Sequence, residues 1–206
     1  MMVLPFRTEK DLQEAFPVVQ WCLSRSQVVA IPTETFYGLA VRPEDPRAVE
    51  RLFALKGREV TKAFPLVGAS LEQLEDLVVI PAAWRARLRE IWPAPLSVVV
   101  AARRQVPACG STAAVRVPAH PLLRELLTIT GPLTATSANP TGKPPAQTVE
   151  ELAPVAQRVD LALDGGATPG RLPSTLVDLT ATPPRLLRPG AFPVPEQWFV
   201  REAKIP

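Results

Sequence analysis

Residue types that usually carry covalent or metal chemistry are scarce in this chain. Its 206 residues include one histidine, His120, and two cysteines, Cys22 and Cys109, which lie far apart without CxxC spacing. A multi-histidine metal site is therefore excluded, and neither a redox motif nor a thiolate metal site is indicated. We expect both cysteines to be small buried hydrophobic residues. We expect His120 to be a surface or helix-capping residue rather than a catalyst.

Long apolar runs and the common phosphate-binding signatures are also missing. No window suits a membrane span, and acidic residues interrupt the opening stretch MMVLPFRTEKDL, where a signal peptide would be apolar. We therefore expect a cytoplasmic protein with no membrane partner. No GxSxG, Walker or GxGxxG sequence is present. Covalent catalysis by a serine is not indicated, and a bound nucleotide would need a different phosphate-binding loop.

The composition is that of an ordinary folded protein. Hydrophobic residues make up 47% and charged residues 21% of the chain, which is close to the average for globular proteins. A chain of 206 residues suits a single domain, so we expect one domain over residues 1–206. The net charge of +3 is compatible with anionic partners, such as a nucleotide or RNA, but does not require them.

Helix and strand signals alternate along the chain. Thr8 and Asp11 resemble a capping box that begins a helix despite Pro17, and the pair Asp45–Pro46 begins a helix that ends at Gly57. Further helices are expected from residue 70, over 84–92, over 121–128 and from residue 148. Strands are expected at 28–31, 36–41, 64–67, 95–102, 112–118, 159–163, 174–179 and 184–188, and within 132–139, where a strand runs into a loop. The interleaving predicts an α/β fold with a mixed sheet.

Hydroxyl and amide side chains recur near fixed positive charges, next to apolar strands or within them. These residues are Thr33, Thr35, Lys56, Arg58, Lys62, Thr112, Arg116, Ser137, Asn139, Ser174 and Arg188. A polar group placed there needs a partner, since burial without one costs on the order of 1 to 3 kcal/mol. Arginine and lysine suit phosphate or carboxylate. The pattern therefore predicts a site for an anionic ligand.

Each of these signals also has a simpler interpretation when taken alone. The cations of the LKGR segment at a helix end favour the helix dipole. Arg116 lies in an alternating segment and is compatible with exposure on one sheet face. The 137–139 segment suits a turn that stabilises its own backbone. Ser174 suits a strand start, and Arg188 suits an exposed charge.

The order and spacing of several motifs resemble the YrdC-like family, whose characterised members are threonylcarbamoyl-AMP synthases. The matching segments run in one order over nearly the whole chain: PTETFYGL at 32–39, LKGR at 55–58, WPAPLSVVV at 92–100, TAAVRVPAHP at 112–121, TATSANPTGKPP at 134–145, STLVDL at 174–179 and LLRPGAF at 186–192. The family's KxR and SxN pairs stand here as Lys56, Arg58, Ser137 and Asn139.

This resemblance implies an open, twisted, mixed α/β sheet flanked by helices, with a basic concave face. It implies that threonine is bound by Thr35, Arg116 and Ser174. It implies that ATP is bound by Arg58, Lys62, Thr112, Ser137, Asn139 and Arg188, with Lys56 and Arg58 stabilising charge. The implied reaction joins L-threonine, bicarbonate and ATP. Mg²⁺ is expected to arrive with the nucleotide, without protein side chains as ligands.

The sequence departs from the family pattern at several positions. Glu59 replaces the usual proline after KxR, Val67 stands where some relatives have a threonine-contacting histidine, and Pro145 replaces a frequent serine. These departures bear on affinity and single contacts rather than on the reaction class. Longer relatives carry an extra C-terminal domain, whereas this sequence ends shortly after LLRPGAF, so we expect no such domain.

Two other functions remain open at this point. A basic concave sheet is also compatible with an RNA-binding module, although one tyrosine and few other aromatics leave little for base stacking. A paralogue with a different small substrate is the other alternative. The resemblance implies that tRNA or other RNA on the basic face and a downstream tRNA threonylcarbamoyl transferase complex are the macromolecular partners to expect.

Overall fold

The computed structural model describes residues 1–57 and 63–199 of the chain. Its α-helices are α1 (Glu9–Ser24), α2 (Pro46–Lys56), α3 (Leu71–Glu75), α4 (Ala82–Ile91) and α5 (Pro121–Thr130). Short 3-10 helices cover Glu150–Leu152, Ala156–Arg158 and Glu196–Phe199. The strands are β1 (Met2–Pro5), β2 (Val29–Ile31), β3 (Gly38–Ala40), β4 (Leu66–Val67), β5 (Val78–Val79), β6 (Leu96–Ala102), β7 (Thr112–Arg116), β8 (Leu133–Thr134), β9 (Thr136–Ser137), β10 (Leu161–Asp164), β11 (Thr175–Asp178) and β12 (Arg185–Arg188).

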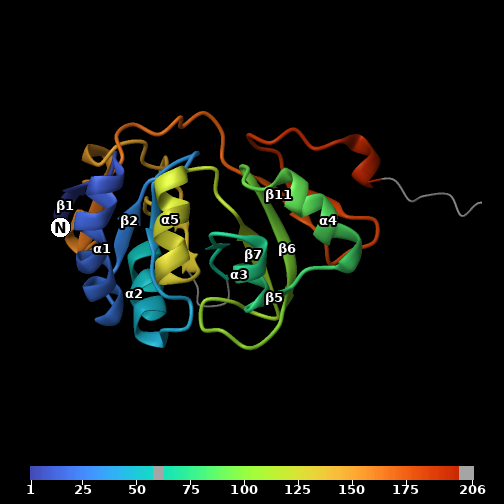
Figure 1. The fold of residues 1–206 in the computed structure, drawn as a ribbon, viewed down its shortest axis with the longest axis horizontal. Helices are drawn as coiled ribbons and strands as arrows, with labels where there is room; N and C mark the ends of the chain where they lie inside the picture. The colour runs from blue at the N-terminus through green and yellow to red at the C-terminus, as the bar shows by residue number, and fades with distance from the viewer. Residues whose placement is uncertain (58–62, 200–206) are drawn as a thin grey trace, which may run out of the picture.

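These strands form two hydrogen-bonded sheets, each with parallel and antiparallel pairs. The first has five strands in the order β1-β10-β2-β3-β9, and the second has seven, in the order β12-β11-β6-β7-β4-β8 with β5 beside β6. In Figure 1 the first sheet lies with α1, α2 and α5 in one half of the molecule, and the second lies with α4 in the other. The chain crosses between the halves several times, so each sheet combines segments that are distant in sequence.

Local sequence signals explain where the two longest helices begin and end. The Thr8 hydroxyl accepts a hydrogen bond from the Asp11 amide at 3.1 Å, and the Asp11 carboxylate accepts one from the Thr8 amide at 2.9 Å. The Asp45 carboxylate caps α2, which ends at Gly57 with a φ of +56°. Glycine adopts this left-handed conformation without a steric penalty. Both predicted helix starts are confirmed.

Two apolar cores cover opposite faces of the first sheet. Residues of α1 and α5, including Val19 and Leu123, pack with Val29 and Ile31 of β2 on one face. The other face packs against α2, and this second core continues onto the seven-stranded sheet. Because β2 is buried on both faces, its sequence is a continuous apolar run rather than an alternating one.

The predicted α/β class with mixed sheets and flanking helices is confirmed, although the strands divide between two sheets. Several element boundaries differ: the strand predicted at 36–41 is only Gly38–Ala40, and the helix predicted from residue 148 is a single 3-10 turn. The short strands β1 and β5 were not predicted.

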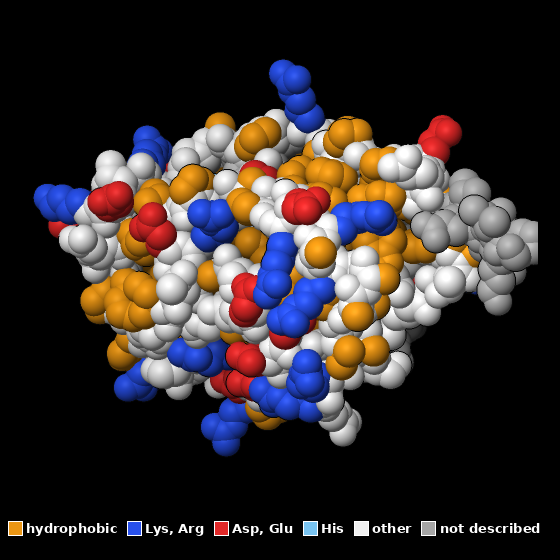
Figure 2. Space-filling model, turned by 45° about the vertical axis from the view of Figure 1, so that its right-hand side comes forward, with side chains coloured by type: hydrophobic (Ala, Val, Ile, Leu, Met, Phe, Trp, Pro, Cys, Tyr) orange, Lys and Arg blue, Asp and Glu red, His pale blue; other side chains and the backbone are white. Residues whose placement is uncertain are grey.

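None of the helices in the described part of the chain is long and apolar enough to cross a membrane. Figure 2 shows one face of the molecule, on which Lys and Arg side chains are interspersed with Asp and Glu side chains. This view does not test the predicted basic concave face, which stays a prediction.

Candidate functional site

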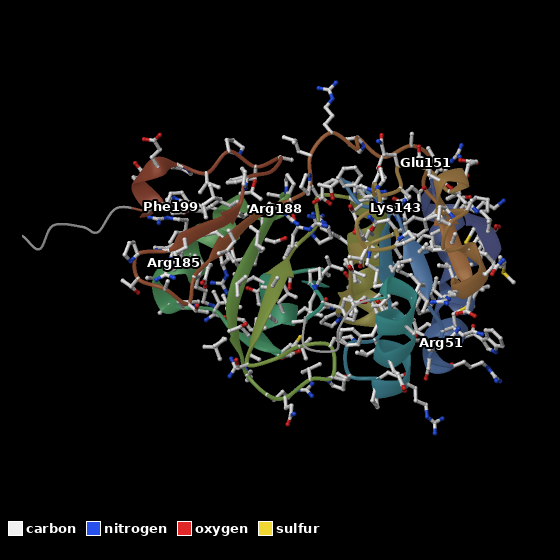
Figure 3. All side chains as sticks on the ribbon, turned by 180° about the vertical axis from the view of Figure 1, so that it is seen from behind. Arg51, Lys143, Glu151, Arg185, Arg188 and Phe199 are labelled. Carbon is white, nitrogen blue, oxygen red and sulfur yellow. The ribbon has the colours of Figure 1, made fainter. Side chains whose placement is uncertain are left out.

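A cavity of about 580 Å³ is lined by residues from both sheets. Every predicted site residue that the structure describes contributes to its lining: Thr35, Lys56, Thr112, Arg116, Ser137, Asn139, Ser174 and Arg188. Figure 3 labels Arg188, which β12 carries toward the middle of the molecule. Arg58 and Lys62 lie outside the described residues. The structure thus brings together groups separated by more than half the chain.

Lys56, at the C-terminal end of α2, connects that helix to the 137–139 loop through hydrogen bonds. Its ammonium group donates hydrogen bonds to the carbonyl oxygen of Ser137 at 2.7 Å and to that of Asn139 at 2.6 Å. It also donates to the side-chain oxygen of Asn139 at 2.8 Å. Only 6% of Lys56 is exposed. The helix-dipole interpretation is therefore incomplete, since this buried cation also organises the loop.

The 137–139 loop is held by its own side chains as well. The Ser137 hydroxyl donates to the Asn139 side-chain oxygen at 2.6 Å, and the Asn139 side-chain amide donates to the carbonyl oxygen of Lys143. The Thr141 hydroxyl donates to the carbonyl oxygen of Lys56 at 2.7 Å. The turn interpretation and the site interpretation are therefore compatible, because this self-stabilised loop also lines the cavity.

Arg116, on β7, forms a buried ion pair with Glu34. Its Nη1 atom lies 2.9 Å from Glu34 Oε1, and the two side chains are only 8% and 13% exposed. Nη1 also donates a long hydrogen bond of 3.5 Å to the Thr35 hydroxyl. The ion pair lacks good hydrogen-bond geometry, because neither Glu34 oxygen has a hydrogen-bond partner. Arg116 is thus buried against the cavity rather than exposed on a sheet face.

Arg188 meets Ser174 where β11 and β12 pair. The Nη2 and Nε atoms of Arg188 donate to the carbonyl oxygen of Ser174 at 2.9 and 3.2 Å. The Ser174 hydroxyl lies 2.9 Å from the hydroxyl of Ser97, which belongs to β6. Both hydroxyls also line the cavity. The predicted residues Ser174 and Arg188 are therefore direct neighbours, 14 positions apart in the chain.

Positive charge exceeds negative charge around the cavity. Burial lowers the pKa of Arg116, and the nearby Glu34 carboxylate opposes this effect. Partial desolvation also lowers the pKa of Arg188, although this residue is exposed overall, and the positive charge of Arg116 lowers it further. Repulsion between the buried Arg116 and the exposed Arg188 is relieved when an anion binds between or beside them. The arrangement therefore favours a ligand that carries phosphate or carboxylate groups.

Glu34 and Ser97 are site residues that sequence reasoning missed. Both lie within motifs that carry the family resemblance, PTET and PAPLS, but periodicity does not show which way these side chains face. Val67, one of the departures from the family pattern, also lines the cavity. Among the described residues no group of three or more His, Cys, Asp or Glu side chains is placed to hold a metal ion.

The remaining candidates from the sequence have structural roles. His120 is the N-cap of α5, and its Nδ1 atom accepts a hydrogen bond from the Leu123 amide at 3.2 Å, so the capping prediction is confirmed. Cys22 is buried as predicted, whereas Cys109 is only partly buried against the core. Burial raises the pKa of the Cys109 thiol to about 11, which makes it a poor nucleophile at neutral pH.

Comparison with known proteins identifies a family. The sequence model of the Sua5/YciO/YrdC family, described as "Telomere recombination", matches residues 22–190. A threonylcarbamoyl-AMP synthase of Pseudomonas aeruginosa is 40% identical over 160 residues, covering 74% of this chain and 85% of that protein. A threonylcarbamoyl-AMP synthase of Pyrococcus abyssi is 38% identical over 181 residues, covering 84% of this chain and 53% of that protein.

A solved structure supports the same relationship. The crystal structure of P. abyssi Sua5 complexed with L-threonine superposes with a TM-score of 0.83 at 34% identity, over 92% of this chain and 58% of that one. The chain thus spans about half the length of the P. abyssi relative that it matches.

Proposed function

Because the chain belongs to the Sua5/YciO/YrdC family, we propose that it is an enzyme that makes threonylcarbamoyl-AMP. The substrates would be L-threonine, bicarbonate and ATP, and pyrophosphate would be the second product. The reaction class would be nucleotidyl transfer. Relatives named threonylcarbamoyl-AMP synthase, at 38 and 40% identity, support this proposal.

The observation that carries the proposal is the convergence of cations and hydroxyls on one cavity. Segments from both sheets supply Lys56, Arg116 and Arg188 together with several hydroxyl groups. A volume of about 580 Å³ lies within the usual range for small-molecule sites. Such a cavity has room for a nucleotide beside an amino acid, and its excess positive charge matches phosphates and a carboxylate.

In this proposal, Arg116, Thr35 and Ser174 bind threonine. Arginine presents a planar pair of donors that fits a carboxylate, so Arg116 would hold the α-carboxylate. The buried Thr35 hydroxyl lies beside it, at 3.5 Å from Nη1. The amine of threonine would face the cavity, where it would form a carbamate with bicarbonate as a C–O bond of bicarbonate breaks and water is lost.

Arg188, Thr112, Ser137 and Asn139 would bind ATP, together with Arg58 and Lys62 outside the described residues. A carbamate oxygen would attack the α-phosphorus, and the bond to the β-phosphate oxygen would break to release pyrophosphate. The protein needs no nucleophile of its own for this step. Holding the reactants in line contributes roughly 7 to 11 kcal/mol in favourable cases, and neutralising the phosphates is the other large effect.

Mg²⁺ would enter with ATP and offset negative charge on its phosphates. The side chains around the cavity fit this arrangement. Glu34 is the carboxylate that pairs with Arg116, and both of its oxygens are buried. The hydroxyl and amide groups that line the cavity are weaker magnesium ligands than phosphate oxygens. The product would then pass to an enzyme that modifies tRNA.

Incubation with L-threonine, bicarbonate, magnesium and ATP, followed by mass detection of the adenylate, tests the proposal. We expect pyrophosphate release to depend on threonine and bicarbonate, with L-serine as a weaker competitor. Salt-dependent RNA binding without ATP turnover would contradict the proposal and favour an RNA-binding module. Turnover that requires a different amine would favour a paralogue with another substrate.

A further inference from the structure

Glu34 has no role in the function proposed above, yet its carboxylate is buried beside the cavity. Neither of its oxygens is accessible to solvent or accepts a hydrogen bond, although Oε1 lies 2.9 Å from Arg116 Nη1. A buried carboxylate without hydrogen bonds is costly unless a nearby charge compensates it. Arg116 is the one cation in an ion pair with Glu34 among the residues that the structure describes.

A rigid turn holds Glu34 in this place. The Thr33 hydroxyl accepts hydrogen bonds from the amides of Thr35 and Phe36, at 3.1 and 3.2 Å, and donates one to the carbonyl oxygen of Phe36 at 2.7 Å. The Gly170 amide donates to the carbonyl oxygen of Thr35 at 2.9 Å, which anchors the turn to a distant segment. The carboxylate therefore projects from a fixed backbone, as a group that orients another side chain must.

The burial of its oxygens decides how Glu34 can act. A general base or a direct ligand needs an oxygen that reaches the substrate, and here both oxygens are covered. Glu34 is also absent from the cavity lining, whereas its neighbours Thr33 and Thr35 are part of it. Direct chemistry by Glu34 would require the turn to move, so its effect on a ligand must pass through Arg116.

The ion pair with Glu34 is made at Nη1 of the Arg116 guanidinium group. The hydrogen bond to the Thr35 hydroxyl uses the same nitrogen. Nε and Nη2 make no hydrogen bond to any residue in the described ranges, and Arg116 lines the cavity. Because the guanidinium group is planar, an anchor at Nη1 restricts the direction in which the other donors point.

We propose that Glu34 is a positioning residue that orients Arg116 so that its remaining donors receive the carboxylate of the amino-acid substrate. The identity of that substrate rests on the proposed function, but the orientation of Arg116 does not. His120 also interacts electrostatically with Glu34, but burial lowers the pKa of His120 and so favours its neutral form, which leaves Arg116 as the counterion of Glu34. Glu34 and Arg116 therefore act as a unit.

Steady-state kinetics of Glu34→Gln test this role. This variant removes the charge and keeps the shape, and we expect the KM for threonine to rise about tenfold or more while the KM for ATP stays within about twofold. Glu44→Gln is the matched control, because it removes an exposed carboxylate that pairs with Arg104 at the surface. Equal increases in both KM values, or an unchanged KM for threonine, would overturn the inference.

A double-mutant cycle separates positioning from general structural support. In an Arg116→Lys background, Glu34→Gln should add little to the rise in the KM for threonine, because the group that it orients is already gone. If the increases in the KM for threonine from the two substitutions were additive in free energy, the inference would be overturned. If Glu34→Gln does not fold, Glu34→Asp provides the same readouts, since it keeps the charge but shortens the reach to Nη1.

The mobility of the Arg116 side chain can be measured without substrates, so it tests the role of Glu34 independently of the proposed function. In protein labelled with ¹⁵N-arginine, the Arg116 guanidinium signals should show restricted rotation in the parent and faster rotation in Glu34→Gln. A parent that restrains Arg116 but makes no adenylate would refute the proposed function and leave the role of Glu34 intact. A parent that makes adenylate, with unchanged Arg116 signals and kinetics in Glu34→Gln, would refute the role of Glu34 alone.

Discussion

Buried polar residues in this protein take their roles from the partners that the fold places beside them. Lys56 has an exposed fraction of 6%, and its ammonium group donates hydrogen bonds to the 137–139 loop. Arg116 is equally buried and is compensated by Glu34. Removing one member of such a pair typically costs about 3 to 5 kcal/mol, because the other is left buried and uncompensated. Substitutions at these positions therefore need a stability measurement beside every activity measurement.

His120 makes stability depend on pH. Burial lowers its pKa below the usual value of 6.5, and its Nδ1 atom accepts the Leu123 amide as the cap of α5. The unfolded chain therefore takes up the proton more readily than the folded protein, so stability falls as the pH drops below about 6.5. We expect the urea midpoint to fall between pH 8 and pH 5.5 by more in the parent than in His120→Asn, which keeps a capping acceptor but does not titrate.

The chain contains one histidine, so this comparison isolates a single imidazole group. Carboxylates that titrate in the same range affect both proteins alike and cancel in the difference. An identical pH dependence in the two proteins would show that the cap of α5 is not sensitive to protonation.

At the scale of elements, the segment after β12 is fixed by a close approach of two backbones. The Ala191 amide donates to the carbonyl oxygen of Pro173 at 2.8 Å. A Cβ atom on Gly190 would overlap with the backbone of Pro173 and Thr175, which leaves glycine as the residue that fits. This contact flanks Ser174 and therefore sets the distance between Arg188 and the start of β11.

Gly190→Ala should move Arg188 away from Ser174. The extra carbon must push two backbone segments apart, and overpacking of this kind typically costs about 1 to 3 kcal/mol. We expect lower stability in a urea titration and a higher KM for ATP, because Arg188 lines the cavity. Gly110→Ala is the control, since a Cβ there meets nothing within 4 Å. If Gly190→Ala and Gly110→Ala had the same stability and the same KM for ATP, the Gly190 contact would not determine the position of Arg188.

At the scale of the whole molecule, the cavity walls belong to two separate sheets. Thr35 and Ser137 come from segments beside or within the five-stranded sheet, while Arg116 and Arg188 belong to the seven-stranded one. A ligand that contacts both walls bridges them. Its binding free energy then stabilises the folded state as a whole, because the unfolded chain has no such cavity.

Threonine should therefore raise the melting temperature. A ligand at about 100 times its Kd contributes roughly 2.7 kcal/mol, and each kcal/mol shifts the Tm of a domain of this size by about 2 to 4 °C. We expect a shift of roughly 5 to 10 °C by differential scanning calorimetry in the parent. Arg116→Lys should lose most of it, since lysine cannot offer two parallel donors. An equal shift in this variant would place threonine elsewhere.

Local pattern and residue type were sufficient to predict much of this protein. Capping residues such as Thr8 and Asp45 predicted where helices begin, because these interactions span only a few residues. Because histidine and cysteine are scarce, cations and hydroxyls are the candidate site groups, and every such candidate within the described residues lines one cavity. Strands of two residues, such as β5, were missed because so short a run carries no periodicity.

Contacts between distant segments, by contrast, arise from the packing of the folded chain. Lys56 and Asn139 are 83 positions apart, so no local pattern links the ammonium group to the loop that it holds. Likewise, no sequence signal pairs Glu34 with Arg116 or divides the strands between two sheets, because these depend on how the apolar faces pack. Short-range hydrogen bonding and hydrophobic patterning, which are local in the chain, thus account for the elements and for the chemical groups available. Long-range packing decided which of those groups meet around the cavity.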